Sequence, residues 1–413
     1  MLEMGSKISP FLSLTVKEYR LFLFGFFVSQ MGMQMQIVAI NWQIYQMTHS
    51  AVMLGLVGVI SFVPMMLLAP IGGMTADHMS RKKLLIATQI VLVMVACLLT
   101  LATATGTASL VIIFVLLTLE FSAMAFFGPV RQSIIPDMVP REYLLNAISL
   151  SILTRQSAVV IGPAIAGLLI ALYGVGSVYA LNAVALLIMI ITLVPLKIPA
   201  HARTDNSSFG ITSFMDGLRF ITSSKIILST TLLDFFATFF GSATSLLPIF
   251  ATDILHVDAK GLGLLYAATS AGAVLAGVGL SALKKLHHQG RAIIGAVALY
   301  GMATVGFGLS RSFYLSLTLL AVAGGADIVS TILRNNIRQT LTPAHMRGRM
   351  TGINILFTQG GPKLGDAEAG FVAAALSAPA SVVIGGIGTI LTTLFVALSM
   401  PRLRKFKGDE LTI

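Results

Sequence analysis

Apolar segments of about 20 residues recur along almost the whole chain, and they constrain its fold more than any other feature. A helix of that length crosses the hydrocarbon core of a bilayer. Charged residues make up only 10% of the sequence, against about 25% in a soluble domain. We therefore predict an all-α membrane protein with twelve transmembrane helices, over residues 19–46, 51–75, 84–105, 109–131, 144–173, 177–197, 225–253, 261–283, 291–310, 314–336, 350–376 and 380–400.

The positions of the basic residues indicate how the spans are oriented. The formal net charge is +11, and most of the 27 Lys and Arg residues fall in segments that face one side, including both ends and the central loop. The loops of the other side contain only Lys260 and Arg311. By the positive-inside rule, both termini are predicted to be cytoplasmic. The basic excess is thus a topology signal, and we expect no nucleic-acid partner.

Several functional classes lack their signatures in this sequence. The single cysteine, Cys97, lies in an expected span, so no disulfide framework is predicted. No cleavable signal peptide is evident, because the first apolar segment has the length of a full span. The seven histidines fall in loops or at span ends and suggest no metal site. No Walker-type phosphate loop occurs. We therefore expect no cofactor, no metal and no enzymatic activity.

The chain contains an internal repeat. Residues 120–136 read EFSAMAFFGPVRQSIIP, and residues 327–343 read DIVSTILRNNIRQTLTP. Glu120 and Asp327, and likewise Arg131 and Arg338, stand 207 positions apart, about half the chain length. A second match, GPAIAG at 162–167 and GDAEAG at 365–370, has a slightly shorter offset of 203. The sequence therefore predicts two duplicated halves.

Duplicated halves of six spans are typical of secondary transporters, whose substrate site lies at the interface of the halves near the membrane midplane. We expect an N-terminal six-helix half over residues 1–197, a polar cytoplasmic loop over 198–224, and a C-terminal half with a short tail over 225–413. A bundle duplicated only for stability would explain the symmetry but not the charges inside the spans.

Two acidic residues are predicted to lie deep in the membrane. Glu120 and Asp327 each precede by eleven residues an arginine that marks a cytoplasmic end, a depth of roughly 16 Å at 1.5 Å per residue. Arg155, in the fifth span, is a plausible partner for Glu120, or else forms a static salt bridge that holds helices together. For Asp327 the candidate partners are Lys363 and Arg334.

Three further acidic residues are candidates for proton coupling. Asp234 lies in DFFATFF and has no basic neighbour on its own helix, so we expect it to exchange a proton near neutral pH. Asp366 and Glu368 lie two positions apart and so on different faces of a helix. One of them is expected to face the cavity while the other braces a neighbouring helix. Whether this couple serves coupling or helix packing stays open at the level of the sequence.

Glutamines in the first span are candidates for the wall of the cavity. Gln30 and Gln34 lie four positions apart, on one helical face. The other polar and methionine-rich positions of this span are more typical of packing.

Two motifs resemble those of a known superfamily. Residues 72–83, GGMTADHMSRKK, resemble the loop signature of the major facilitator superfamily, with Gly73, Asp77, Arg81 and Lys82 at matching positions. His78 and Ser80 depart from that signature, and a histidine weakens the charge of the loop because it is only partly protonated at neutral pH. Gly162, Pro163 and Gly167 resemble a reduced form of the helix-packing signature of antiporters in this superfamily.

Other stretches, such as RGRMTGINILF and LGDAEAGFVAA, are similar to the branch that contains the enterobactin exporter and the macrolide efflux proteins. The resemblance implies the major facilitator fold in a bacterial inner membrane, and a monomer that moves a small, partly hydrophobic siderophore or drug outward in exchange for protons. Many drug antiporters carry an arginine in the fourth span, where this chain has Glu120. The alternatives are a macrolide or multidrug efflux pump, and a transporter-shaped membrane partner protein without coupling.

Overall fold

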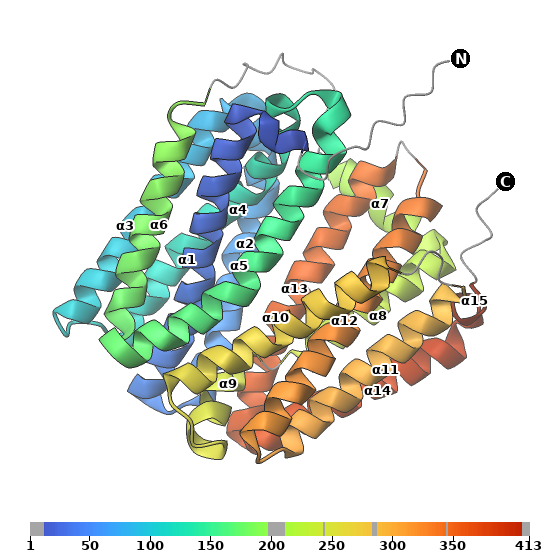
Figure 1. Cartoon of the computed structure of the whole chain (residues 1–413). Helices are drawn as coiled ribbons and strands as arrows, with labels where there is room; N and C mark the ends of the chain where they lie inside the picture. Colours follow the sequence, from blue (N-terminus) through green and yellow to red (C-terminus); the bar gives the residue numbers. More distant parts are fainter. Residues whose placement is uncertain (1–11, 197–210, 243, 283–286, 344–345, 407–413) are drawn as a thin grey trace.

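The computed structural model describes residues 12–196, 211–242, 244–282, 287–343 and 346–406. Nearly all of them form helices packed into two bundles (Figure 1). The first bundle follows a short 3-10 turn and comprises α1 (Lys17–Thr48), α2 (Ala51–His78), α3 (Arg81–Ala104), α4 (Leu110–Met138), α5 (Leu144–Tyr173) and α6 (Val175–Leu193). These bounds lie within a few residues of the predicted spans, except for α4, which continues seven residues past the predicted end at 131.

The second bundle begins after α7 (Ile211–Ser223), a helix within the segment predicted as the central loop. Its long helices are α8 (Lys225–Gly241), α10 (Ala259–Ser281), α11 (Gln289–Leu309), α12 (Phe313–Leu341), α13 (Arg347–Ala375) and α14 (Ala378–Ser399), and it closes with α15 (Pro401–Lys405). Helix α7 packs its apolar residues, among them Ile221, against α8 and α13.

Eleven candidate membrane spans occur in the described part of the chain. The remaining predicted span, the eleventh, corresponds to α13, a helix of 29 residues, as long as α12. It is missing from the candidates because Lys363, Asp366, Glu368 and its many glycines lower its hydropathy. It nevertheless packs between α2 and α8 inside the bundle, so the twelve-helix architecture is confirmed.

The two halves share a core at only one end. We call the end where α1 begins the terminal end, and the end where α1 stops the far end. The largest hydrophobic cluster combines far-end residues of both halves, such as Ile44 and Leu54 with Leu262 and Ala369. At the terminal end each half has a separate cluster, around Tyr19 in one and Leu233 in the other. The far end is therefore the closed end.

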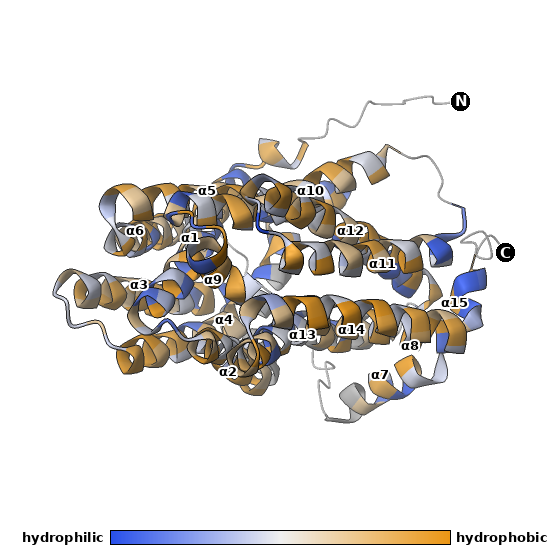
Figure 2. Cartoon of the chain, turned by 90° about the horizontal axis from the view of Figure 1, so that it is seen from below, coloured by the Kyte–Doolittle hydropathy of each residue, from blue (hydrophilic) through white to orange (hydrophobic). Residues whose placement is uncertain are grey.

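Backbone contacts between small residues produce this closure. Helix α5 lies beside α10 on one side of the molecule, and α2 lies beside α13 on the other (Figure 2). A Cβ on Gly167 of α5 would lie 2.8 Å from the Cα of Gly263 in α10, and a Cβ on Gly55 of α2 would lie 3.0 Å from the Cα of Gly370 in α13. Only glycine allows helices to approach this closely.

The seventh predicted span is not one continuous helix. Helix α8 ends at Gly241, and the chain continues through a 3-10 turn (Thr244–Leu246), the single turn α9 (Leu247–Ile249) and a π-helical turn (Phe250–Ile254). Pro248 follows the break, since a proline starts a helical turn readily but cannot continue one. The predicted span over 225–253 is present as Lys225–Ile254, but its helix is interrupted after Gly241.

We predict that Gly167→Leu opens the far end, because its side chain would enter the backbone of α10. Closure can be measured by cross-linking a cysteine at Ala51 to one at Ala374, residues of α2 and α13 that line the same far-end pocket, in a Cys97→Ser background. Cross-linking should fall several-fold. Gly279→Leu, whose Cβ meets open space, should leave it unchanged, and equal cross-linking in both variants would contradict the packing argument.

Candidate functional site

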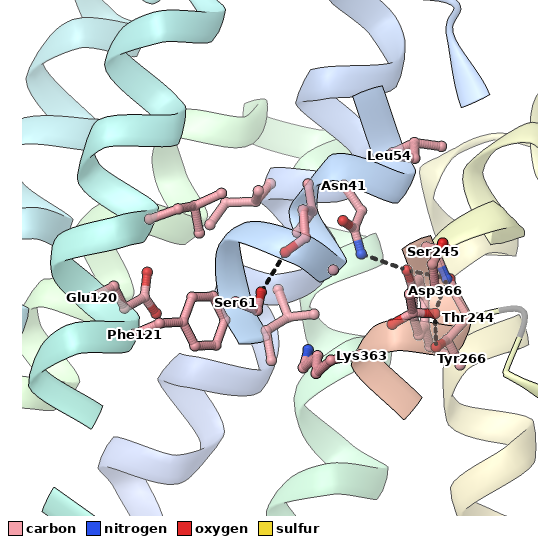
Figure 3. Close-up of a pocket in the computed structure, with 15 residues that line it drawn as sticks. Asn41, Leu54, Ser61, Glu120, Phe121, Thr244, Ser245, Tyr266, Lys363 and Asp366 are labelled. Carbon is pink, nitrogen blue, oxygen red and sulfur yellow. Dashed lines mark hydrogen bonds between the residues drawn. The ribbon is translucent and has the colours of Figure 1, made fainter. Parts of the chain in front are cut away.

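A cavity lies between the two halves, just inside the closed end. Its polar wall comes from α1, α2 and α4 on one side and from the helix break, α10 and α13 on the other (Figure 3). The charged residues that line it are Glu120, Lys363 and Asp366. The cavity has a volume of about 70 Å³, room for only a few water molecules. A drug-sized molecule requires several hundred Å³, so it can reach these residues only if the halves separate.

Glu120 is buried in this cavity and is held by an amide. Its side chain is 5% exposed, and its carboxylate accepts a hydrogen bond of 2.7 Å from Nε2 of Gln36. The Gln36 carbonyl in turn accepts one of 2.6 Å from Asn182 of α6. Among the described residues, Glu120 forms no ion pair within 4 Å. Gln36 and Asn182 therefore fix its position without neutralising its charge.

The predicted pair of Glu120 with Arg155 was wrong. Glu120 lies 18 residues from the terminal end of α4, while Arg155 lies 11 residues from the terminal end of α5. At 1.5 Å per residue these depths are about 27 Å and about 16 Å. The difference of about 10 Å along the bundle is too large for a salt bridge.

Lys363 enters the cavity from the other half. Its Nζ lies 5.4 Å from the ring centroid of Phe121, the neighbour of Glu120. It makes no ion pair with any residue that the structure describes, so the alternative of an Asp327–Lys363 pair does not occur. Lys363 and Glu120 thus bring opposite charges to one cavity from opposite halves, separated by an aromatic ring.

Asp366 braces the broken seventh span. One of its carboxylate oxygens accepts hydrogen bonds from the Ser242 hydroxyl at 3.0 Å, the Thr244 hydroxyl at 3.2 Å and the Ser245 backbone N–H at 3.2 Å. These donors belong to the break between α8 and the following turn. Glu368, by contrast, is half-buried, does not line the cavity and has no hydrogen-bonding partner among the described residues.

A second charged cluster lies inside the C-terminal half. Asp234 of α8 is 4% exposed and pairs with two arginines of α12, Arg334 at 2.9 Å and Arg338 at 2.8 Å. The expectation of an unpaired Asp234 was therefore wrong, because its partners come from another helix. Arg334 also lies 3.8 Å from Asp327, which favours Arg334 over Lys363 among the two predicted partners.

Arg338 is a site residue whose burial the sequence reasoning missed. It was interpreted as the marker of a cytoplasmic end, yet it is only 1% exposed. Besides Asp234 it donates to the Thr230 carbonyl at 2.8 Å and to the Asn354 side chain. The four-residue spacing of Arg334 and Arg338, which places both on one helical face, was the available signal.

The N-terminal half carries two arginines without acids. The Arg131 guanidinium lies 4.7 Å from the ring centroid of Phe26 and donates to the Ser151 hydroxyl at 3.2 Å. Arg155 is exposed. Gln30 contacts Met33, and Gln34 packs beside Gly162 of α5.

The residues of the two sequence motifs have different roles. Arg81 forms an ion pair of 2.6 Å with Asp137 of α4, and Lys82 donates to the carbonyls of Val194 and Leu196 at the end of α6. Gly73 and Asp77 lie in α2, and their contacts fall outside the described part of the structure. Gly162 packs against α1, while Pro163 and Gly167 face α10 of the other half.

Twelve helices in two duplicated bundles, with charged residues at their interface, define a multi-pass membrane transporter of the major facilitator fold. A profile of the transmembrane secretion effector family matches residues 8–412. The chain belongs to this family.

Relatives and solved structures agree with this assignment. The enterobactin exporter EntS of Citrobacter koseri is 30% identical over 387 residues, which cover 92% of this chain and 91% of that protein. A bacterial homologue of the human lysosomal transporter Spinster, inward-facing and unoccupied, superposes with a TM-score of 0.68 at 15% identity over 97% of both chains. A bacterial homologue of the iron transporter ferroportin, also inward-facing, gives 0.70 at 14% identity over 94% of this chain and 99% of that one.

We predict that Asp234→Asn destabilises the protein far more than Asp327→Asn does. The first change leaves two buried arginines without their shared carboxylate, which should lower the free energy of unfolding by about 3–5 kcal/mol. Asp327 has a side chain 42% exposed and a longer contact, so its replacement should cost at most about 1 kcal/mol. Unfolding of the detergent-solubilised variants measures both, and similar losses would refute the assigned pairing.

A separate prediction concerns the helix break. Asp366→Ala should speed hydrogen exchange at the Ser245 amide about fivefold, because losing a capping acceptor costs about 1 kcal/mol. Asp366→Asn keeps an acceptor oxygen and should have a smaller effect. Glu368→Gln is the matched control, and an equal change in that variant would show that Asp366 does not brace the break.

Proposed function

We propose that this protein is a secondary active exporter in a bacterial inner membrane, with cytoplasmic termini and proton-driven alternating access. The observation that carries the proposal is the cavity between the halves, which Glu120 lines from one half and Lys363 from the other. A charge change there acts on the contact between the halves, which is the contact that alternating access must break and remake.

Glu120 is the carboxylate best suited to coupling. When it is ionised, its attraction to Lys363 favours the closed far end. When it is protonated, that attraction disappears while the hydrogen bond from Gln36 can persist. Asp234 is less suited, because its ion pairs with Arg334 and Arg338 lie inside the C-terminal half and not at the contact between the halves. Asp327 remains a second candidate, because its carboxylate is partly exposed and its contact with Arg334 is long.

The exported molecule is small and partly hydrophobic. The similarity to enterobactin exporters supports a siderophore, and a macrolide or another drug is the alternative. The glycine contacts between α5 and α10 and between α2 and α13 are the surfaces that must part at the far end. Separate cores at the terminal end support opening to the cytoplasm in the present conformation. We expect the protein to act as a monomer in the bilayer.

We predict that Glu120→Gln reduces proton-gradient-driven transport at least about tenfold, because a glutamine cannot release a proton. Purified protein in proteoliposomes, with an imposed pH gradient and either a siderophore or a macrolide as substrate, measures this. Glu142→Gln, on an exposed turn of the same half, should transport as wild type does. If neither compound is transported, or if Glu120→Gln transports as fast as wild type, the proposed mechanism is contradicted.

A further inference from the structure

Arg131 and Arg155 have no role in the coupling described above, and their charges are not neutralised locally. Arg131 has a ring and a hydroxyl as its contacts, from Phe26 and Ser151. Neither arginine forms an ion pair within the described ranges. Two such charges inside a membrane protein need either an aqueous surface or an anion to offset the cost of placing them there.

The internal repeat shows that this arrangement is specific to the N-terminal half. Arg131 corresponds to Arg338 at the offset of 207, and Ser151 corresponds to Asn354 at the offset of 203. Both arginines bond these partners. In the C-terminal half, however, Asp234 neutralises Arg338. The residue 207 positions before Asp234 is Phe27, so the N-terminal half keeps the arginine and lacks the acid.

Arg155 points toward the interior of its half and not toward lipid. Ser151, Arg155 and Gly162 share one face of α5, because they are spaced by four and seven residues. Ser151 contacts Arg131 of α4, and Gly162 packs against Gln34 of α1. Arg155, between these two contacts, faces the same side. Its exposure follows from the separation of the halves at the terminal end.

The two arginines also lie at a common level. Helices α1 and α5 pack side by side and both run from the terminal end to the far end. Gly162 of α5 contacts Gln34 of α1, so both helices can be followed from this contact toward the terminal end. Arg155 lies seven residues before Gly162, and Phe26, whose ring contacts Arg131, lies eight residues before Gln34. These steps correspond to about 10 Å and about 12 Å. Gln30, one helical turn from Phe26, adds an amide to the same wall.

We propose that Arg131 and Arg155 form a site for an anionic group, such as the carboxylate or ionised phenol of an aromatic acid. Guanidinium groups suit oxygen anions, since each offers several N–H donors in a fixed plane. The occupant is the transported molecule or the headgroup of an anionic lipid, which share this chemistry. With the transported molecule as occupant, the inference rests on the proposed export function and specifies its substrate class as organic anions.

Binding of 2-naphthoate and of its neutral amide, 2-naphthamide, to the purified full-length protein in phosphatidylcholine nanodiscs tests this site. Wild type should bind the naphthoate, and Arg131→Gln and Arg155→Gln should each weaken that binding at least about tenfold. Arg155→Lys, which keeps the charge, should restore most of it. The exposed Arg141 of the same half provides the control, and Arg141→Gln should bind as wild type does. The affinity for the neutral 2-naphthamide should be the same in wild type and in all of these variants.

A competition experiment with an anionic lipid identifies the occupant. If added phosphatidylglycerol competes with naphthoate in wild type, an anionic lipid fills the site, whereas no competition assigns the site to the transported molecule. Absence of charge-dependent binding to wild type, or equal binding to wild type and both glutamine variants, overturns the proposal. The assay uses no gradient, so its failure is distinguishable from failure of proton-driven export.

Discussion

The cost of placing an ionised group inside a membrane determines where this chain puts its polar side chains. Each deeply placed charge needs a partner or an aqueous surface. In the C-terminal half Asp234 and two arginines satisfy one another across α8 and α12. In the N-terminal half Glu120 rests on an amide network of Gln36 and Asn182. Of the other charges, Lys363 lines the cavity between the halves, and Arg155 is exposed where the halves separate.

Most of the fold could be predicted from the sequence because the bilayer allows few alternatives. Apolar length defined the spans, and the repeated Arg-Gln motifs defined the two halves. The charge partners were harder to predict. Asp234 looked unpaired because sequence neighbours reveal contacts along one helix and not contacts between helices. The amphipathic helix α7 was hidden in a polar segment, and the break after Gly241 was hidden by continuous apolar residues on both sides.

The site was predicted only in part, because sequence neighbours do not show which side chains meet between helices. Glu120, Lys363 and Asp366 were identified as charged residues within predicted spans, and the structure places all three around one cavity. Their roles depend on geometry that a sequence does not contain. Asp366 serves the helix break, and Glu368, two residues later, faces elsewhere. The two halves are duplicated, but their matching arginines have different partners. Arg338 pairs with Asp234, whereas Arg131 contacts Phe26 and Ser151, so the two halves differ in charge.

The break after Gly241 divides the seventh span into a long inner helix, α8, and an outer piece of three short helical turns. The inner helix carries Asp234 and is fastened to α12 by ion pairs. The outer piece belongs to the far-end seal, where Tyr45 of α1 hydrogen-bonds Asp253. The break is fastened to α13 through Asp366, one helical turn from Lys363. We therefore expect a displacement of Lys363 to be transmitted through Asp366 to the break, while the ion pairs of Asp234 hold α8 against α12.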